Sequence, residues 1–138
     1  DDADENPVFG DPTVVSVADK WSVIGKIMGS NWNRDFVMTD GQDDSWSIDI
    51  TYSEGDEFKF RFSGGWDYQY GMWMSDDNEA ITPLGADTVS YGLADGVEND
   101  DENIHRANKN IKLPEAGEYT LRLFTFGEHA GDLYVTKK

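Results

Sequence analysis

Five stretches of this chain follow an alternation of apolar and polar side chains, and this period of two constrains the fold more than any other feature. The clearest stretch is "EFKFRF" at 57–62, where Phe58, Phe60 and Phe62 share one side and charged residues share the other. The others are "WSVIGKI" at 21–27, "SWSIDIT" at 45–51, "EYTLRLF" at 118–124 and "DLYVTK" at 132–137. Successive side chains of a β-strand point to opposite faces of its sheet. The alternation therefore predicts half-buried strands.

Turn-forming sequences separate these stretches, and no segment has a helical period. The turns are "DGQDD", "SEGD", "SGG" and "EAG", which are rich in the residues that favour tight turns. Two further strands are expected in "YQYGMWM" and "NIKL", whereas 76–109 is poorly patterned and is expected to be a long loop. About seven short strands predict an all-β fold, an antiparallel β-sandwich. Residues 14–138 would form this single domain, and the acidic stretch 1–13 a tail or linker.

The strong negative charge limits the classes of partner. The chain has 28 acidic and 11 basic residues, a net charge of −17 and no cysteine. Nucleic acid is excluded because its phosphates require a basic surface. An anionic membrane surface is excluded for the same reason, and no apolar run is long enough to span a membrane. A neutral partner is compatible with this charge, which also favours a soluble monomer.

The aromatic residues divide into two groups. Phe58, Phe60, Phe62 and Trp46 lie on the apolar sides of strands, and they are expected to be in the core, as is Trp21. A second group lies in polar surroundings or beyond the "SGG" break in the alternation, where the pattern no longer says which way each ring points: Trp32, Trp66, Tyr68, Tyr70 and Trp73. These rings either cap the ends of the core or form a platform on which a ligand stacks.

A sugar is the ligand that such a platform suits best. The C–H groups of a pyranose form an apolar face that can lie on an indole ring, and its hydroxyls need donors and acceptors nearby. Lys59 and Arg61 lie on the polar side of their strand and are expected to reach a ligand outside the sheet. Nucleobases also stack on rings, but the net charge opposes a polynucleotide.

No catalytic or metal-binding pattern stands out, and the chain is not expected to be an enzyme. His105 and His129 lack the spacing of metal ligands, and no Ser/His/Asp arrangement or phosphate-binding loop is visible. The many carboxylates leave open a close pair of the glycosidase type, although no pair is singled out. The acidic stretch 95–103 is dense in the oxygen ligands that Ca²⁺ prefers, but it does not follow the EF-hand order, and a solvated loop is the expectation there.

A resemblance supports the sugar hypothesis. The order and spacing of "WSVIGKIMGSNWN", "MTDGQDDSWSIDI", "EGDEFKFRFSGGWDYQYG", "NIKLPEAGEYTLRLF" and "DLYVTKK" resemble starch-binding modules of the SusE/SusF type. Those modules occur in outer-membrane glycan-binding lipoproteins of gut Bacteroidetes, and the related X25-type modules are attached to amylases and pullulanases. The resemblance covers roughly residues 20–138 but does not explain 76–103.

The resemblance implies an immunoglobulin-like β-sandwich without catalytic activity, in which two angled rings bind starch-like α-glucan and a Lys or Arg and an Asn bond its hydroxyls. It also implies a cell-surface or extracellular location, within a multidomain, outer-membrane-anchored protein of polysaccharide utilisation. Together with the two added from the residue pattern, Arg61 and Trp73, the candidate binding residues are Trp32, Lys59, Arg61, Trp66, Tyr70, Trp73, Asn108 and Asn110. The alternatives are a structural or protein-interaction module of a cell-surface glycan-utilisation assembly, and a binder of a different neutral glycan.

Overall fold

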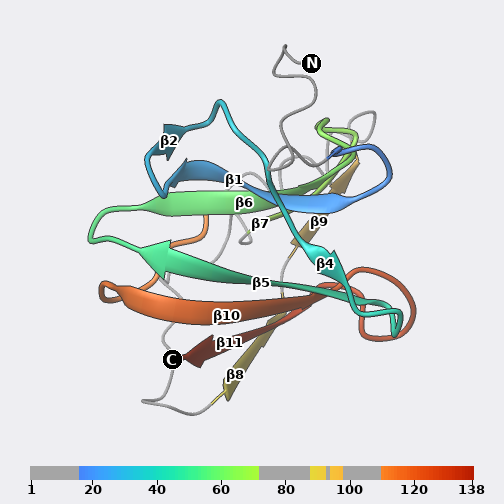
Figure 1. Cartoon of the computed structure of the whole chain (residues 1–138). Helices are drawn as coiled ribbons and strands as arrows, with labels where there is room; N and C mark the ends of the chain where they lie inside the picture. The colour runs from blue at the N-terminus through green and yellow to red at the C-terminus, as the bar shows by residue number, and fades with distance from the viewer. Residues whose placement is uncertain (1–15, 72–87, 93, 98–109) are drawn as a thin grey trace.

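The computed structural model describes residues 16–71, 88–92, 94–97 and 110–138 (Figure 1). In these residues the chain forms strands and turns without a helix, and every strand pairs with its neighbours in the antiparallel sense. The predicted antiparallel β-sandwich is confirmed. The described residues therefore also lack a helix long and apolar enough to cross a membrane.

The first sheet is the upper layer in Figure 1. Its main strands follow the order β2-β1-β6-β7-β9, and β3 pairs with β1 as well. These strands are β1 (Trp21–Ile27), β2 (Ser30–Asn31), β3 (Phe36–Val37), β6 (Glu57–Phe62), β7 (Tyr68–Gly71) and β9 (Ala94–Val97).

The second sheet is the lower layer, with the order β4-β5-β10-β11-β8 (Figure 1). Its strands are β4 (Thr39–Asp40), β5 (Ser45–Tyr52), β8 (Thr88–Gly92), β10 (Gly117–Phe124) and β11 (Asp132–Lys137). Both sheets therefore combine strands from distant parts of the sequence.

The core lies between the sheets and consists of the apolar sides predicted from the alternation. Phe58 and Phe60 of β6 are completely buried, and so are Leu121 and Leu123 of β10 on the facing layer. Trp21 is buried as expected, while Phe62 and Trp46 pack against the core from partly buried positions. Each fully buried side chain of this size contributes about 1.5–3 kcal/mol through removal of apolar surface from water.

Gly25 allows β1 and β6 to approach closely in this core. A Cβ atom at Gly25 would lie 2.2 Å from the carbonyl oxygen of Glu57 and 2.6 Å from the Cα of Phe58. Only a residue without a side chain fits here, which explains the glycine inside an otherwise regular strand.

Two expectations about the elements need correction. The stretch 76–109 is not simply a loop, because it contains β8 and β9. The "NIKL" segment contributes only an isolated bridge between Ile111 and Phe58 rather than a strand. The strands β8 and β9 were missed because each lies at the edge of its sheet, where the neighbouring strand supplies the pairing and little apolar alternation is needed. The "NIKL" segment was overpredicted because its two apolar residues, Ile111 and Leu113, are buried without continuous strand pairing.

Candidate functional site

The outer face of the first sheet is largely covered, although parity predicts that it faces solvent. Ser22, Ile24, Lys59 and Gln69 all lie on this side and are all buried. Ile24 is completely buried but is not among the residues of the core between the sheets. Among the described residues, Asp35 of segment 30–36 and Trp66 of segment 63–67 contact this outer face, through Ser22, Lys59 and Arg61.

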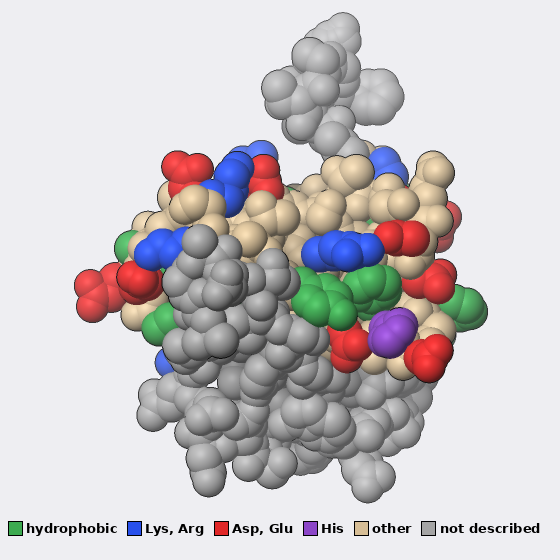
Figure 2. Space-filling view, turned by 90° about the horizontal axis from the view of Figure 1, so that it is seen from below, with side chains coloured by type: hydrophobic (Ala, Val, Ile, Leu, Met, Phe, Trp, Pro, Cys, Tyr) green, Lys and Arg blue, Asp and Glu red, His purple; other side chains and the backbone are tan. Residues whose placement is uncertain are grey.

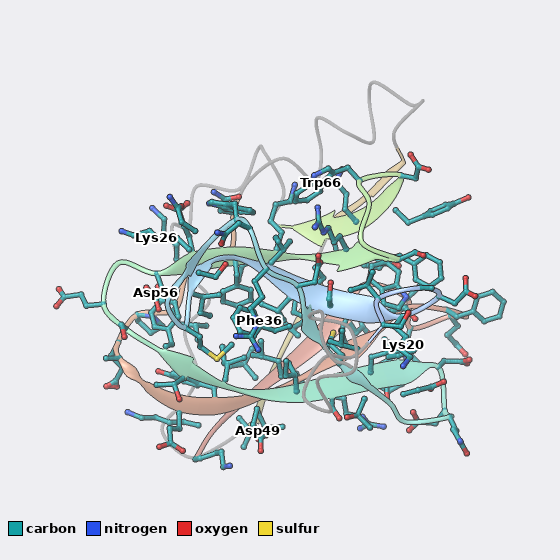
Figure 3. The ribbon with its side chains drawn as sticks, turned by 45° about the horizontal axis from the view of Figure 1, so that its top comes forward. Lys20, Lys26, Phe36, Asp49, Asp56 and Trp66 are labelled. Atoms are coloured by element: carbon teal, nitrogen blue, oxygen red, sulfur yellow. The ribbon has the colours of Figure 1, made fainter. Side chains whose placement is uncertain are left out.

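Trp66 is the central ring of this cover. Its ring centroid lies 4.8 Å from Cζ of Arg61 and 5.5 Å from Nζ of Lys59, so the indole stacks on both cations that β6 presents outward. Such cation–π contacts hold a ring in a fixed orientation. Trp66 is nevertheless 37% exposed, and Figure 3 shows it on the outside of the first sheet, on the side of the molecule opposite Asp49.

Trp32 reaches the same place from a tight hairpin. Met28 and Gly29 both have positive φ at the turn between β1 and β2, as in the turns that match the twist of hairpin strands. The N–H of Trp32 then donates to the carbonyl of Gly25 at 2.9 Å. Trp32 itself has a φ of 64°, a left-handed conformation that costs a residue with a side chain about 1–2 kcal/mol. Backbone strain of this kind is concentrated at functional positions.

The two indoles form an angled pair. Their ring centroids are 6.3 Å apart and their planes are inclined by 42°. Trp32 is half-buried and Trp66 exposed, so the pair presents apolar surface outward. We call Trp32, Trp66, Lys59, Arg61 and Asp35 the tryptophan site.

Asp35 fixes the cation beneath Trp66. Its two carboxylate oxygens accept hydrogen bonds from Nε and Nη2 of Arg61 at 2.8 and 2.6 Å, and the hydroxyl of Ser22 donates to it at 2.6 Å. Burial alone would raise the pKa of Asp35, but the hydrogen bonds from Arg61 and Ser22 and the charge of Arg61 outweigh burial and keep this pKa low. The arginine is thus held as a planar support for the indole.

Lys59 is the most buried charge of the site. Only 5% of the residue is exposed, and its Nζ donates to Oε1 of Gln69, whose own amide donates to the carbonyl of Trp66. Burial lowers the pKa of Lys59 to about 8, because the low-dielectric surroundings disfavour the charged form. Lys59 does lie outside the sheet as predicted, but it lies under Trp66 rather than open to solvent.

The structure brings together four of the eight predicted residues: Trp32, Lys59, Arg61 and Trp66. Tyr70 was a candidate whose exposure the sequence left open, and the structure places it in the core against Trp21, with ring centroids 5.2 Å apart. Asn110 lies beside the first residue of β6, since its amide donates to the carboxylate of Glu57, and within the described residues it makes no hydrogen bond with Trp32, Trp66, Lys59 or Arg61. Trp73 and Asn108 lie outside the described residues, as does 98–103 of the acidic stretch that is expected to be a solvated loop.

Two side chains of the candidate site were not predicted from the sequence. Asp35 lies in "NWNRD", where nothing marks it as the partner of an arginine 26 residues away. Gln69 is isolated in an aromatic segment, and only the strand register places it opposite Arg61. No alternation or motif predicts the position of Asp35 or of Gln69, since both positions depend on contacts between segments that are distant in the sequence.

Comparison with known proteins adds no assignment. Protein-family models, curated proteins and solved structures gave no match to this chain. Within the described residues, no group of three or more His, Asp or Glu side chains lies together as metal ligands would. The geometry of the site therefore has to carry the functional argument.

Proposed function

We propose that this chain is a non-catalytic carbohydrate-binding domain and that the tryptophan site is where the sugar binds. The observation that carries the proposal is the angled pair of indoles, 6.3 Å apart and inclined by 42°. Two rings at an angle suit successive units of a curved chain better than a flat one. Starch-like α-glucan, a maltooligosaccharide or its polymer, is therefore the proposed ligand, and an extracellular or cell-surface location follows from such a substrate.

The polar groups around the rings match a neutral ligand. Asp35 occupies Nε and Nη2 of Arg61, which leaves Nη1 without a partner in the described part of the chain and able to donate to a hydroxyl. Asp35 compensates the charge of Arg61, and the remaining cation of the site, Lys59, is buried beneath Trp66 and hydrogen-bonded to the neutral Gln69. A small site of this kind binds weakly by itself and gains strength when several modules act on one polymer.

The site is built in advance of the ligand. Trp66 is held by two cations and a hydrogen bond through Gln69, and Trp32 by a backbone bond to β1. Ordering flexible side chains on binding costs about 0.5–1.5 kcal/mol each. Rings that are already fixed avoid this cost, which matters most for a weak ligand.

Affinity gel electrophoresis in amylopectin tests the proposal directly. We expect the wild-type protein to be retarded and Trp66→Ala to lose most of the retardation. Tyr68→Ala is the matched control, because Tyr68 is a nearby exposed ring that contacts Phe62 and not the indole pair. Equal migration of wild type with and without the polysaccharide contradicts binding to starch.

A structural or protein-interaction role is the competing function, and one observation favours it. The indole of Trp66 covers Arg61 and the buried Lys59, which is also what a ring does when it merely shields a sheet face from water. Under this alternative, tryptophan fluorescence is unchanged by maltoheptaose. Under the carbohydrate-binding proposal, the emission shifts because Trp66 is buried by the sugar.

A further inference from the structure

The outer face of the second sheet holds a second ring-and-arginine cluster. Cζ of Arg122 lies 4.7 Å from the ring centroid of Phe124, and the ring of Tyr134 on the neighbouring strand lies 5.8 Å from Phe124 at 80°. All three alternate with the buried Leu121, Leu123, Leu133 and Val135, so they point away from the core. The cluster is separate from the tryptophan site, which lies on the opposite side of the sandwich.

A groove runs along this cluster. Its volume is about 400 Å³, and it is lined by Thr120, Arg122, Phe124, Tyr134 and Thr136. Small-molecule sites range over about 300–1,000 Å³, so the groove is large enough for a sugar unit. Figure 2 shows this face, where hydrophobic side chains gather between a basic side chain and the histidine. The ring of His129 lies 5.9 Å from that of Phe124. His129 is the one histidine among the described residues, so it is the histidine coloured in Figure 2.

The cluster repeats the construction of the tryptophan site. There, Ser22 donates to Asp35, Asp35 accepts from Arg61, and Arg61 supports Trp66. Here, Ser45 donates to Asp43, Asp43 accepts from Nη2 of Arg122 at 2.7 Å, and Arg122 stacks on Phe124. In both cases a serine and an aspartate fix an outward arginine of a strand against an aromatic ring.

The polar groups of the groove point to a neutral sugar. Asp43 compensates the charge of Arg122, so the groove lacks the excess of positive charge that an anion would need in a chain with a net charge of −17. Nη1 of Arg122 and the hydroxyl of Tyr134 make no hydrogen bond within the described part of the chain. Nη1 of Arg122 can donate to a sugar hydroxyl, and the hydroxyl of Tyr134 can both donate and accept. The neighbouring ring faces can pack against the C–H groups of the sugar.

We infer that Phe124, Tyr134 and Arg122 form a second binding site for a neutral glycan on the outer face of the second sheet. This inference shares with the proposed function only the class of ligand. Because the two sites lie on opposite faces, one domain would hold two separate glycan segments, and binding to a polymer would be stronger than to a short oligosaccharide through avidity.

Backbone amide NMR of the ¹⁵N-labelled wild-type protein tests this inference without relying on a variant that might not fold. The protein is titrated in turn with maltoheptaose, cellohexaose, xylohexaose and mannohexaose. We expect at least one of them to shift two separate groups of signals, one from 31–35 and 59–69 and the other from 120–124 and 132–136. Shifts confined to the first group overturn the second site and leave the proposed function standing.

The remaining outcomes separate the two claims. Shifts confined to the second group support the second site and contradict the tryptophan site, and no shift with any of the four sugars overturns both. Substitutions then show which side chains of the second site contact the sugar. Tyr134→Ala should weaken binding at the second group about fivefold to tenfold, as the loss of one aromatic contact implies. Lys138→Ala is the control, because it removes a different cation of the same face, one paired with Asp49, and should leave the affinity unchanged.

Discussion

Each outer face of the sandwich combines an aromatic ring, an arginine, an aspartate and a serine, but the two faces bury the ion pair to different extents. At the tryptophan site, the side chains of Arg61 and Asp35 are only 14% and 13% exposed. On the second sheet, the side chains of Arg122 and Asp43 are 46% and 49% exposed. On the first face Trp66 and Asp35 lie against Arg61, whereas on the second face the ion pair of Arg122 is open to solvent.

This difference separates two ways of supporting a ring. A covered ion pair holds its geometry because water does not compete for it, but breaking it leaves a charge without a partner. An exposed pair is weak, screened by salt and easily rearranged. We therefore expect the tryptophan site to be rigid, with a large loss of stability when one partner is removed. The second site should be adaptable and tolerant of substitution.

The largest expected effect concerns the two aspartates. Asp35→Ala removes both carboxylate bonds of Arg61 and leaves a mostly buried guanidinium uncompensated, which should lower the free energy of unfolding by about 3 kcal/mol. Asp43→Ala breaks the corresponding contact to Arg122 at an exposed position, and its effect should be much smaller. Urea denaturation of both variants measures the difference. Equal losses of stability would show that burial does not distinguish the two faces.

The next effect comes from Lys59, which has no counterpart on the second sheet. Its pKa is lowered from 10.5 to about 8 by burial, so the folded state carries a penalty at neutral pH for keeping this amine charged. In the window from pH 8 to 10.5 the unfolded chain binds more protons than the folded one, and stability therefore rises with pH. We expect the free energy of unfolding to increase by about 2 kcal/mol between pH 7 and 9.5 from this group.

Denaturant titrations at several pH values measure this rise, with Lys59→Met as the control. The variant replaces the amine with an apolar group of similar length and should lose the pH-dependent increase. The range stays below pH 10 because burial raises the pKa of Tyr52 and of Tyr119, and ionisation of these tyrosines would lower stability instead. An identical pH profile in wild type and variant would contradict the buried, perturbed amine.

The smallest effect tests the strain at Trp32. Asn adopts the left-handed backbone conformation more readily than Ala, so Trp32→Asn should be more stable than Trp32→Ala by about 1 kcal/mol. Both variants lose the indole, and both should lose binding at the tryptophan site to the same extent. Thermal unfolding compares their stabilities. A less stable Asn variant would indicate that the positive φ of Trp32 is not retained.

The alternation in the sequence was enough to predict the sandwich and most of its core. Phe58, Phe60, Leu121 and Leu123 each lie where period two places them. The alternation also placed Lys59 and Arg61 on the outer side of β6, which is correct. Such local patterns are readable because a strand has only two faces, and one residue of register decides between them.

The features that could not be predicted from the sequence depend on contacts between distant segments. Tyr70 follows the "SGG" turn, where the count of alternation restarts, and the pairing of Phe60 with Tyr70 is what places this ring in the core. The covered outer face could not be predicted because it requires Asp35 and Trp66 to lie against it from outside the strands. The aspartate partners of both arginines were missed for the same reason.

The most direct test of the central claim is the NMR spectrum of the indole N–H groups during titration with maltoheptaose. The chain has five tryptophans, and each gives its own signal, which single substitutions assign. We predict that the signals of Trp32 and Trp66 move together and saturate at the same sugar concentration, while those of Trp21 and Trp46, packed in or against the core, stay in place. Unchanged signals of Trp32 and Trp66 at saturating sugar would contradict the proposal that this angled pair binds α-glucan.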